Sequence, residues 1–375
     1  MPGLRPDVDP DGLQEFSVVF TDRSLNHMSR RFQAVMRDIS ATLAEVHGAG
    51  ASALVPGGGT CAMEAVARQF CRGARVLILR NGYFSYRWSQ ILETAGLAGE
   101  ASVLMARPAG NDPQPAFAPA PIDEVVARIR AERPEVVLAP HVETAAGMIL
   151  PDPYVRAMAD AAHEVGALMV LDGVASGAVW IDMPATGVDV LISAPQKGWS
   201  ASPSAGMVMF SPRALERLAA TRSDSFALDL ARWRAIMQAY EDGGHAYHAT
   251  LPTDALAGLR DAMAETREMG FAAACEAQWR LGRLVREDLA ARGLRSVAAE
   301  GFAAPGVVVC HTDDPELQSG RRFALHGCQI AAGVPLQIGE GEGFRSFRIG
   351  LFGLDKLKDV EGTLARLRAV FDAVL

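Results

Sequence analysis

The sequence predicts an α/β protein whose main part is a large, doubly wound and mostly parallel sheet of seven strands. A smaller α+β part is expected to follow it. Over the first two hundred residues, seven short apolar runs alternate with helical patterns, as in a parallel sheet that is covered on both faces. From about residue 254 the pattern changes to a long helical stretch and then to a short α+β segment.

The expected strands and helices alternate along the first part of the chain. Strands are expected at 52–56, 75–80, 102–106, 136–140, 167–172, 188–195 and 206–210, and helices at 61–71, 84–96, 121–134 and 151–166. No helix of full length separates the last two strands, so we expect one of them to run antiparallel.

The second part begins with one long helical stretch at 253–293. Strands at 306–312 and 346–350 and a closing helix at 360–375 follow it. The Pro- and Ala-rich segment 106–121 is expected to be a surface loop. We therefore predict an N-terminal arm over 1–20, a large domain over 21–255, and a long connecting helix with a small α+β domain over 256–375.

The composition disfavours several classes of protein. The 375 residues include 36 Lys and Arg against 44 Asp and Glu, a formal charge of −8, which disfavours nucleic acid and anionic lipid as partners. No apolar stretch approaches the roughly 20 residues of a membrane helix, and the first residues lack the parts of a secretory leader. Five cysteines without a C-x-x-C pair favour reduced thiols over disulfides or a zinc site. We therefore expect a cytoplasmic protein without a metal.

Lysine is rare in this chain, and one lysine lies in an unusual place. Of the 36 basic residues only Lys197, Lys356 and Lys358 are lysines, and the last two stand in a polar stretch at the start of the closing helix. Lys197 instead follows the apolar segment 188–195. An ammonium group can lose its proton and form an imine, whereas a guanidinium group does neither. Lys197 is therefore a candidate Schiff-base lysine, and a lone charge on a loop is the simpler alternative.

Other candidate residues follow the predicted strands, where ligands bind in doubly wound sheets. Asp172 ends the strand at 167–172, and an ionised carboxylate there would hold a ring nitrogen in its protonated form. An aspartate before a glycine is also a common turn residue. Phe84 follows the strand at 75–80 and offers an aromatic face to a flat cofactor, with core packing as the alternative.

A glycine-rich turn, Gly57-Gly58-Gly59-Thr60, lies between the first strand and the first helix. Backbone N–H groups and a hydroxyl in such a place bind phosphate, although many glycine-rich turns bind nothing. The turn lacks the spacing of G-x-G-x-x-G and the lysine of a Walker loop, so dinucleotides and nucleoside triphosphates are disfavoured.

Two further groups of polar residues are candidates. His141, Glu143 and Thr144 follow the strand at 136–140, and Glu143 is either a hydrogen-bond partner or an acid or base. Arg348 is a candidate clamp for a substrate carboxylate, which guanidinium binds bidentately; a surface salt bridge is the alternative. A phosphate cradle, a stacking ring, a strand-end aspartate and a distinctive lysine, in this order, describe a pyridoxal phosphate site.

From about Asn26 to the C-terminus the chain resembles the fold-type I, class V aminotransferases of the alanine–glyoxylate and serine–pyruvate kind. The segments that carry the resemblance are GGGTCAMEA, NGYF, HVETAAG, VLDGVAS, SAPQKGWSASPSAG, YHATLPTDAL and FRIGLFG. It implies that Lys197 carries pyridoxal 5′-phosphate and that Asp172 pairs with the pyridine nitrogen. The other residues implied to contact the cofactor are Gly58, Gly59, Thr60 and Gln196 at the phosphate, Phe84 on the ring and Thr144 near the ring hydroxyl.

The resemblance also implies residues for the substrate and for a second subunit. Arg348 matches the arginine that binds the substrate α-carboxylate. Tyr247 and Thr250 match residues that reach the phosphate in the neighbouring subunit, which implies a homodimer with shared sites. The chain departs from the family in having Phe84 where Trp is usual and in lacking the opening Pro-Gly-Pro-Ser/Thr signature.

The implied reaction is transamination from a small L-amino acid, such as alanine or serine, to a 2-oxo acid such as glyoxylate or pyruvate. A class V lyase or cysteine desulfurase, an aminophosphonate transaminase and a binding protein built on the same fold are the alternatives. Desulfurases resemble one another in having His before the lysine, where this chain has Gln196. Arg23, Arg87 and Arg345 are candidates to bind a second anionic group of the substrate.

Overall fold

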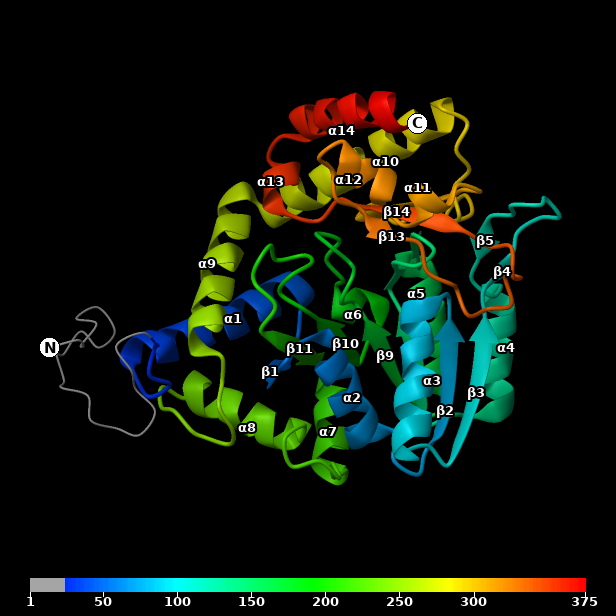
Figure 1. The fold of residues 1–375 in the computed structure, drawn as a ribbon. Coiled ribbons are helices and arrows are strands. Elements are labelled where there is room, and N and C mark those ends of the chain that lie inside the picture. Colours follow the sequence, from blue (N-terminus) through cyan, green and yellow to red (C-terminus); the bar gives the residue numbers. More distant parts are fainter. Residues whose placement is uncertain (1–23) are drawn as a thin grey trace, which may run out of the picture.

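The computed structural model describes residues 24–375 and has a seven-stranded sheet at its centre (Figure 1). The arm expected over residues 1–20 lies outside the described residues. The strands stand in the order β1-β11-β10-β9-β6-β2-β3. Their bounds are Ala51–Pro56 (β1), Arg75–Arg80 (β2), Glu100–Met105 (β3), Val136–Pro140 (β6), Leu168–Asp172 (β9), Val190–Ser193 (β10) and Ala205–Phe210 (β11).

The sheet is parallel except at one strand. β10, β9, β6, β2 and β3 pair with one another in parallel, whereas β11 is antiparallel to both β1 and β10. The short connection between β10 and β11 leaves no room for a crossover helix, so β11 returns beside β10 in the opposite direction. The predicted mostly parallel fold with one antiparallel strand is confirmed.

Helices surround this sheet. The four helices expected from the sequence are α2 (Gly59–Phe70), α3 (Tyr83–Ala95), α4 (Ile122–Glu132) and α5 (Asp152–Glu164). The sequence analysis did not identify α1 (Arg30–His47), α6 (Met183–Thr186), α7 (Pro212–Ala220) and α8 (Leu230–Glu241). Ser29 caps α1 by accepting a hydrogen bond from the backbone N–H of Phe32, which is a common signal at the start of a helix.

A second, smaller sheet lies over the end of the large sheet at which the arrowheads of β2, β3 and β9 point in Figure 1. It contains β12 (Val307–His311), β14 (Ser346–Gly350) and β13 (Ala331–Ala332) in that order, all antiparallel. Its helices are α11 (Pro315–Gln318), α12 (Arg321–Leu325), α13 (Leu354–Leu357) and α14 (Val360–Val374). Its core is a separate cluster of buried side chains that includes Phe323, Phe347 and Phe371.

The long helical stretch at 253–293 is not a single helix, which corrects the sequence prediction. It forms α9 (Thr253–Met269) and α10 (Phe271–Ala291), separated by Gly270. Gly270 has a φ of +91°, a backbone angle that residues other than glycine rarely adopt. Its N–H donates to the carbonyls of Thr266 and Arg267 and so closes α9. No helix in residues 24–375 combines the length and apolar character needed to span a membrane.

Two short strand pairs complete the fold. The segment expected to be a plain surface loop contains β4 (Arg107–Pro108) and β5 (Phe117–Ala118), which pair antiparallel. Phe117 is buried there, because it packs against Phe344 of the small-sheet part. The second pair, β7 (Val142–Glu143) and β8 (Met148–Ile149), follows β6 directly.

The packing of α2 against β11 depends on a glycine, and this gives a first prediction. A Cβ atom at Gly206 of β11 would lie 2.3 Å from the Cβ of Ala62 and 2.7 Å from the carbonyl oxygen of Gly58. Gly206→Ala should therefore lower the free energy of unfolding by roughly 1–3 kcal/mol, because the helix must shift. Urea unfolding measures this change.

Gly258→Ala in α9 is the matched control, since a Cβ atom there would meet nothing within 4 Å. Removing a glycine from a helix interior should stabilise the protein by about 0.5–1 kcal/mol. Equal effects of the two substitutions would show that α2 does not need this close approach.

Candidate active site

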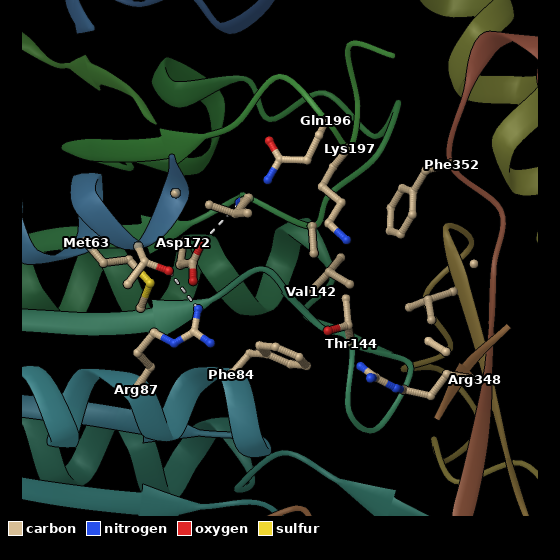
Figure 2. Close-up of a pocket in the computed structure, with 17 residues that line it drawn as sticks. Met63, Phe84, Arg87, Val142, Thr144, Asp172, Gln196, Lys197, Arg348 and Phe352 are labelled. Atoms are coloured by element: carbon tan, nitrogen blue, oxygen red, sulfur yellow. Dashed lines mark hydrogen bonds between the residues drawn. The ribbon is translucent and has the colours of Figure 1, made fainter. Parts of the chain in front are cut away.

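A cavity of about 350 Å³ lies where the small sheet meets the loops that follow the parallel strands (Figure 2). This volume is within the range of small-molecule sites. The cavity brings together nine residues that the sequence analysis singled out from segments far apart in the chain. They are Gly59, Thr60, Phe84, Arg87, Thr144, Asp172, Gln196, Lys197 and Arg348.

Asp172, the last residue of β9, is a buried carboxylate at the base of the cavity. Its Oδ1 accepts a hydrogen bond of 3.0 Å from the backbone N–H of Val174. Burial, opposed by the hydrogen bond from Val174 and by the Arg87 charge and assisted by the Glu143 charge, raises the pKa of Asp172 to about 6. Because desolvation disfavours the charged form, a positively charged group of a ligand would be bound strongly here.

Lys197 lies in the loop after β10, with its Nζ 5.1 Å from the centroid of the Phe352 ring. Burial lowers the pKa of Lys197, and the Arg348 guanidinium lowers it further. No carboxylate in the described part of the chain forms an ion pair with this amine. A larger share of the amine is therefore neutral and nucleophilic near physiological pH than for a surface lysine.

Phe84 lies in the first turn of α3, and Glu143 fixes this turn. The Glu143 carboxylate accepts hydrogen bonds from the backbone N–H groups of Phe84 at 3.2 Å, Ser85 at 2.8 Å and Ala145 at 3.0 Å. It also accepts one from the Ser85 hydroxyl at 2.7 Å. Both carboxylate oxygens are thus engaged at a helix N-terminus, where negative charge is favourable. Of the two roles left open for Glu143, the structure favours the hydrogen-bond partner.

The position of the Glu143 side chain also explains why the residue before this turn, Gly82, is a glycine. A Cβ atom at Gly82 would lie 2.6 Å from the Cγ of Glu143. Any larger residue would push the carboxylate away from the backbone N–H groups that it accepts from. Within the motif Asn81-Gly82-Tyr83-Phe84, Gly82 lets Glu143 come close enough to hold the backbone N–H of Phe84, and this fixes the position of the Phe84 ring.

Arg348, on β14, brings the small sheet into the cavity. Its Nε donates a hydrogen bond of 2.8 Å to the carbonyl oxygen of Ala332, and its guanidinium carbon lies 5.4 Å from the centroid of the Phe84 ring. Within residues 24–375, no hydrogen bond engages its two Nη groups. They are available to a carboxylate in the cavity.

The glycine-rich turn places the first residues of α2 at the opposite side of the cavity from Arg348 (Figure 2). Gly58 is the residue before α2 and is not among the residues that line the cavity, whereas Gly59 and Thr60 are. A Cβ atom at Gly59 would lie 2.6 Å from the Cγ2 of Val174, so glycine lets the helix approach the loop after β9. The backbone N–H groups of this helix end suit an anion.

Tyr247 and Thr250 do not line this cavity. They line a second cavity together with Ser24 and His27, and the Tyr247 hydroxyl lies 3.4 Å from the Thr250 Oγ1. Tyr247 is 59% exposed. The fold of a single chain therefore leaves these two residues apart from Lys197.

Sequence reasoning did not place two of the charged and aromatic residues that line the cavity. Phe352 was not singled out, although it lies in the quoted segment FRIGLFG. Arg87 was named only as one of three unplaced cations; its position one helical turn after Phe84 was the signal that would have placed it beside that ring. Arg345 lines a different cavity, and Arg23 lies outside the described residues.

The groups in the cavity fit a flat, phosphorylated aldehyde with a basic ring nitrogen. The Lys197 amine is suited to condense with a carbonyl, and the buried Asp172 carboxylate to pair with a protonated ring nitrogen. The N-terminus of α2 and Thr60 suit a phosphate. No group of three or more His, Cys, Asp or Glu side chains suited to a metal occurs in residues 24–375.

Comparison with known families and proteins agrees with this chemistry. The family model described as "Aminotransferase class-V" matches residues 13–317. A 2-aminoethylphosphonate–pyruvate transaminase from Burkholderia mallei is 30% identical over 92% of this chain and 89% of its own length. A protein from Synechococcus called soluble hydrogenase, small subunit, is 27% identical over 92% of this chain and 86% of its own length.

Solved structures share the fold. An aspartate aminotransferase from Thermus thermophilus has a TM-score of 0.76 and 26% identity, covering 94% of this chain and 93% of that one. An alanine–glyoxylate aminotransferase from Nostoc sp. has a TM-score of 0.75 and 24% identity, covering 92% of this chain and 89% of that one. These likenesses extend over both sheets of the structure.

The raised pKa of Asp172 gives a prediction for the ligand-free protein. The penalty for burying its charge is absent below the ordinary value of 3.8, grows as the pH rises, and is complete above about 6. Asp172→Asn removes the penalty. The free energy of unfolding of this variant, relative to that of the wild type, should therefore increase between these pH values by a total on the order of 3 kcal/mol.

Urea unfolding of both proteins from pH 4 to pH 7.5 measures this difference. A difference between the two proteins that stays constant with pH would show that Asp172 titrates normally.

Proposed function

This chain belongs to the class V aminotransferase family and is a transaminase, and we propose that it uses pyridoxal 5′-phosphate bound at Lys197. We propose further that it moves the amino group of a small L-amino acid, such as alanine or serine, to a 2-oxo acid such as glyoxylate or pyruvate. The observation that carries the proposal is the meeting of Lys197, Asp172 and the N-terminus of α2 around one cavity.

The residues present would hold this cofactor in the following way. Gly58, Gly59, Thr60 and Gln196 would hold its phosphate, Thr144 would lie near its hydroxyl, Phe84 would stack on its ring, and Asp172 would pair with its nitrogen. When bound, the cofactor supplies an electron sink for the negative charge that develops at the substrate Cα.

Lys197 is the general acid and base of the proposal. Its Nζ would take the proton from the substrate Cα and hold it during the transfer of the amino group. A lowered pKa suits this role, because an efficient base titrates near the working pH. Asp172 holds the proton on the ring nitrogen throughout.

Arg348 is proposed to orient the amino acid. Its free Nη groups suit the α-carboxylate, while the Phe84 and Phe352 rings form apolar walls of the same cavity. These contacts hold the Cα–H bond in one direction relative to Lys197 and reduce the water around it.

An aminophosphonate donor is a second candidate, favoured by the transaminase from Burkholderia mallei at 30% identity. Arg348 would then meet a phosphonate in place of a carboxylate. Desulfuration is disfavoured, because it needs a reactive thiolate. Burial raises the pKa of Cys310 to about 12 and raises that of Cys328 as well, so both remain protonated thiols.

The cysteines also support a cytoplasmic location, which we propose. All five of them, Cys61, Cys71, Cys275, Cys310 and Cys328, are free thiols. Proteins of oxidising compartments more often pair their cysteines.

Lys197→Ala tests the proposed chemistry. The purified wild type with pyridoxal phosphate should show a visible absorption band that bleaches when an amino donor is added, and a 2-oxo acid should restore it. The variant should lose the band of covalently bound cofactor and all measurable turnover, since no other lysine lines the cavity. A variant that keeps both the band and turnover would end the assignment.

A panel of donors and acceptors, read from the same band, identifies the substrates. Alanine, serine and 2-aminoethylphosphonate are the informative donors, and glyoxylate and pyruvate the informative acceptors. Bleaching by the phosphonate alone would replace the first substrate proposal with the second.

A homodimer with shared sites is also proposed, because Tyr247 and Thr250 lie outside the cavity of their own chain. Lys197→Ala and the double variant Tyr247→Ala/Thr250→Ala should each be impaired. Random exchange of their subunits should restore about a quarter of wild-type activity, since half of the dimers then contain one complete site of two. A protein that sediments as a monomer would contradict the proposal.

A further inference from the structure

We propose that Arg87 supplies the positive charge that binds the phosphate of the cofactor. This inference rests on the proposed use of pyridoxal phosphate. It adds to the proposed phosphate site a residue that the resemblance did not imply.

The need for such a residue follows from charge. A phosphate monoester carries about 1.5 to 2 negative charges near pH 7. The residues proposed above to hold it are all neutral: Gly58, Gly59, Thr60 and Gln196 from this chain, and the partner's Tyr247 and Thr250. The N-terminus of α2 adds only about half a positive charge. Without a further cation, most of the phosphate charge would stay uncompensated.

Three cationic side chains line the cavity, and two of them have other roles. Lys197 is proposed to carry the cofactor aldehyde, and Arg348 lies on the small sheet, where it is proposed to bind the substrate carboxylate. Arg87 is the third. It is the one that touches the proposed phosphate site.

Arg87 is hydrogen-bonded to the start of α2. Its Nη1 donates to the Thr60 Oγ1 at 2.9 Å, and Figure 2 shows the guanidinium on the side of the cavity where Asp172 lies. In the described part of the chain no carboxylate forms an ion pair with Arg87. Its charge acts on the Asp172 carboxyl and lowers the pKa of that group, but no ion pair holds the guanidinium, so an anion that also binds the Thr60 hydroxyl can reach it.

The first turns of α3 position this cation together with the stacking ring. The guanidinium carbon of Arg87 lies 5.4 Å from the centroid of the Phe84 ring, three residues earlier in the helix. Glu143 holds the backbone of that turn through the N–H groups of Phe84 and Ser85. One helix end thus presents both an aromatic face and a cation to the same flat, phosphorylated molecule.

Phe84 also separates two positive charges. The Arg348 guanidinium carbon lies 5.4 Å from the same ring centroid, and Figure 2 shows Arg87 and Arg348 on opposite sides of Phe84. We assign Arg87 to the anion of the cofactor and Arg348 to the anion of the substrate. The competing assignment, in which Arg87 binds a second anionic group of the substrate, makes a different prediction for cofactor affinity.

The test compares two aldehydes that differ only in the phosphate. Protein freed of cofactor is titrated with pyridoxal phosphate and with pyridoxal, and the dissociation constants are read from absorbance. Arg87→Gln should weaken the binding of pyridoxal phosphate about 10- to 100-fold, the range for a charge-assisted hydrogen bond. It should leave the binding of pyridoxal within about twofold.

Arg348→Gln is the matched comparison, because it removes a guanidinium at the same distance from the same ring. It should leave the ratio of the two dissociation constants unchanged. Inorganic phosphate should compete with pyridoxal phosphate for the wild type and compete less well for Arg87→Gln. If Arg87→Gln does not fold, Arg87→Lys, which keeps the charge and loses the planar fork, should show a smaller loss in the same direction.

Three results would overturn the inference. An unchanged affinity ratio in Arg87→Gln, with a raised KM for a doubly anionic donor, would assign Arg87 to the substrate. An equal loss of the ratio in Arg348→Gln would show a general effect of net charge. A wild type that binds neither aldehyde would remove the proposed function itself, which distinguishes that failure from the failure of this inference alone.

Discussion

A carboxylate buried at the carboxyl end of β9 is the constraint on which the rest of the site depends. Asp172 has one backbone hydrogen bond and little contact with solvent, so its charge is costly until a cation meets it. The parallel strands bring the loops of α2, α3 and β10 to the same edge of the sheet. Those loops supply an amine, an aromatic ring and a helix N-terminus around this one carboxylate. A buried carboxylate in this position favours a ligand that carries a positive charge.

The charge of a second buried carboxylate, that of Glu143, is stabilised by the protein itself. Glu143 accepts four hydrogen bonds, three of them from backbone N–H groups, so its charge is compensated within the protein. These hydrogen bonds favour a supporting role for Glu143 over that of an acid or base. By fixing the first turn of α3, it determines where Phe84 and Arg87 point. The two acids lie close enough for Glu143 to raise the pKa of Asp172, yet their hydrogen bonds give them different roles.

The small sheet completes the cavity from the other side. β14 carries Arg348, and Phe352, two residues after the end of this strand, faces Lys197. The Phe352 ring fits against the backbone only because glycines stand beside it: a Cβ atom at Gly306 would lie 2.8 Å from the ring. The break at Gly270 separates α9 from α10 within the stretch that leads from the large sheet to this part. The Arg348 side of the cavity thus depends on how the two clusters of buried side chains pack together, whereas Asp172 and Lys197 follow neighbouring strands of one sheet.

The sequence by itself determined the alternation of strands and helices, the mostly parallel sheet, and the position of Lys197 and Asp172 after neighbouring strands. Local patterns suffice to predict these features, because the spacing of apolar residues and the ends of strands can be read from contiguous residues. It did not determine α1, the two helices in place of one at Gly270, or the roles of Glu143, Arg87 and Phe352. Those depend on backbone groups and rings brought together from distant segments. A hydrogen bond between Arg87 and Thr60 joins residues 27 positions apart, and only the packing of α3 beside α2 brings it about.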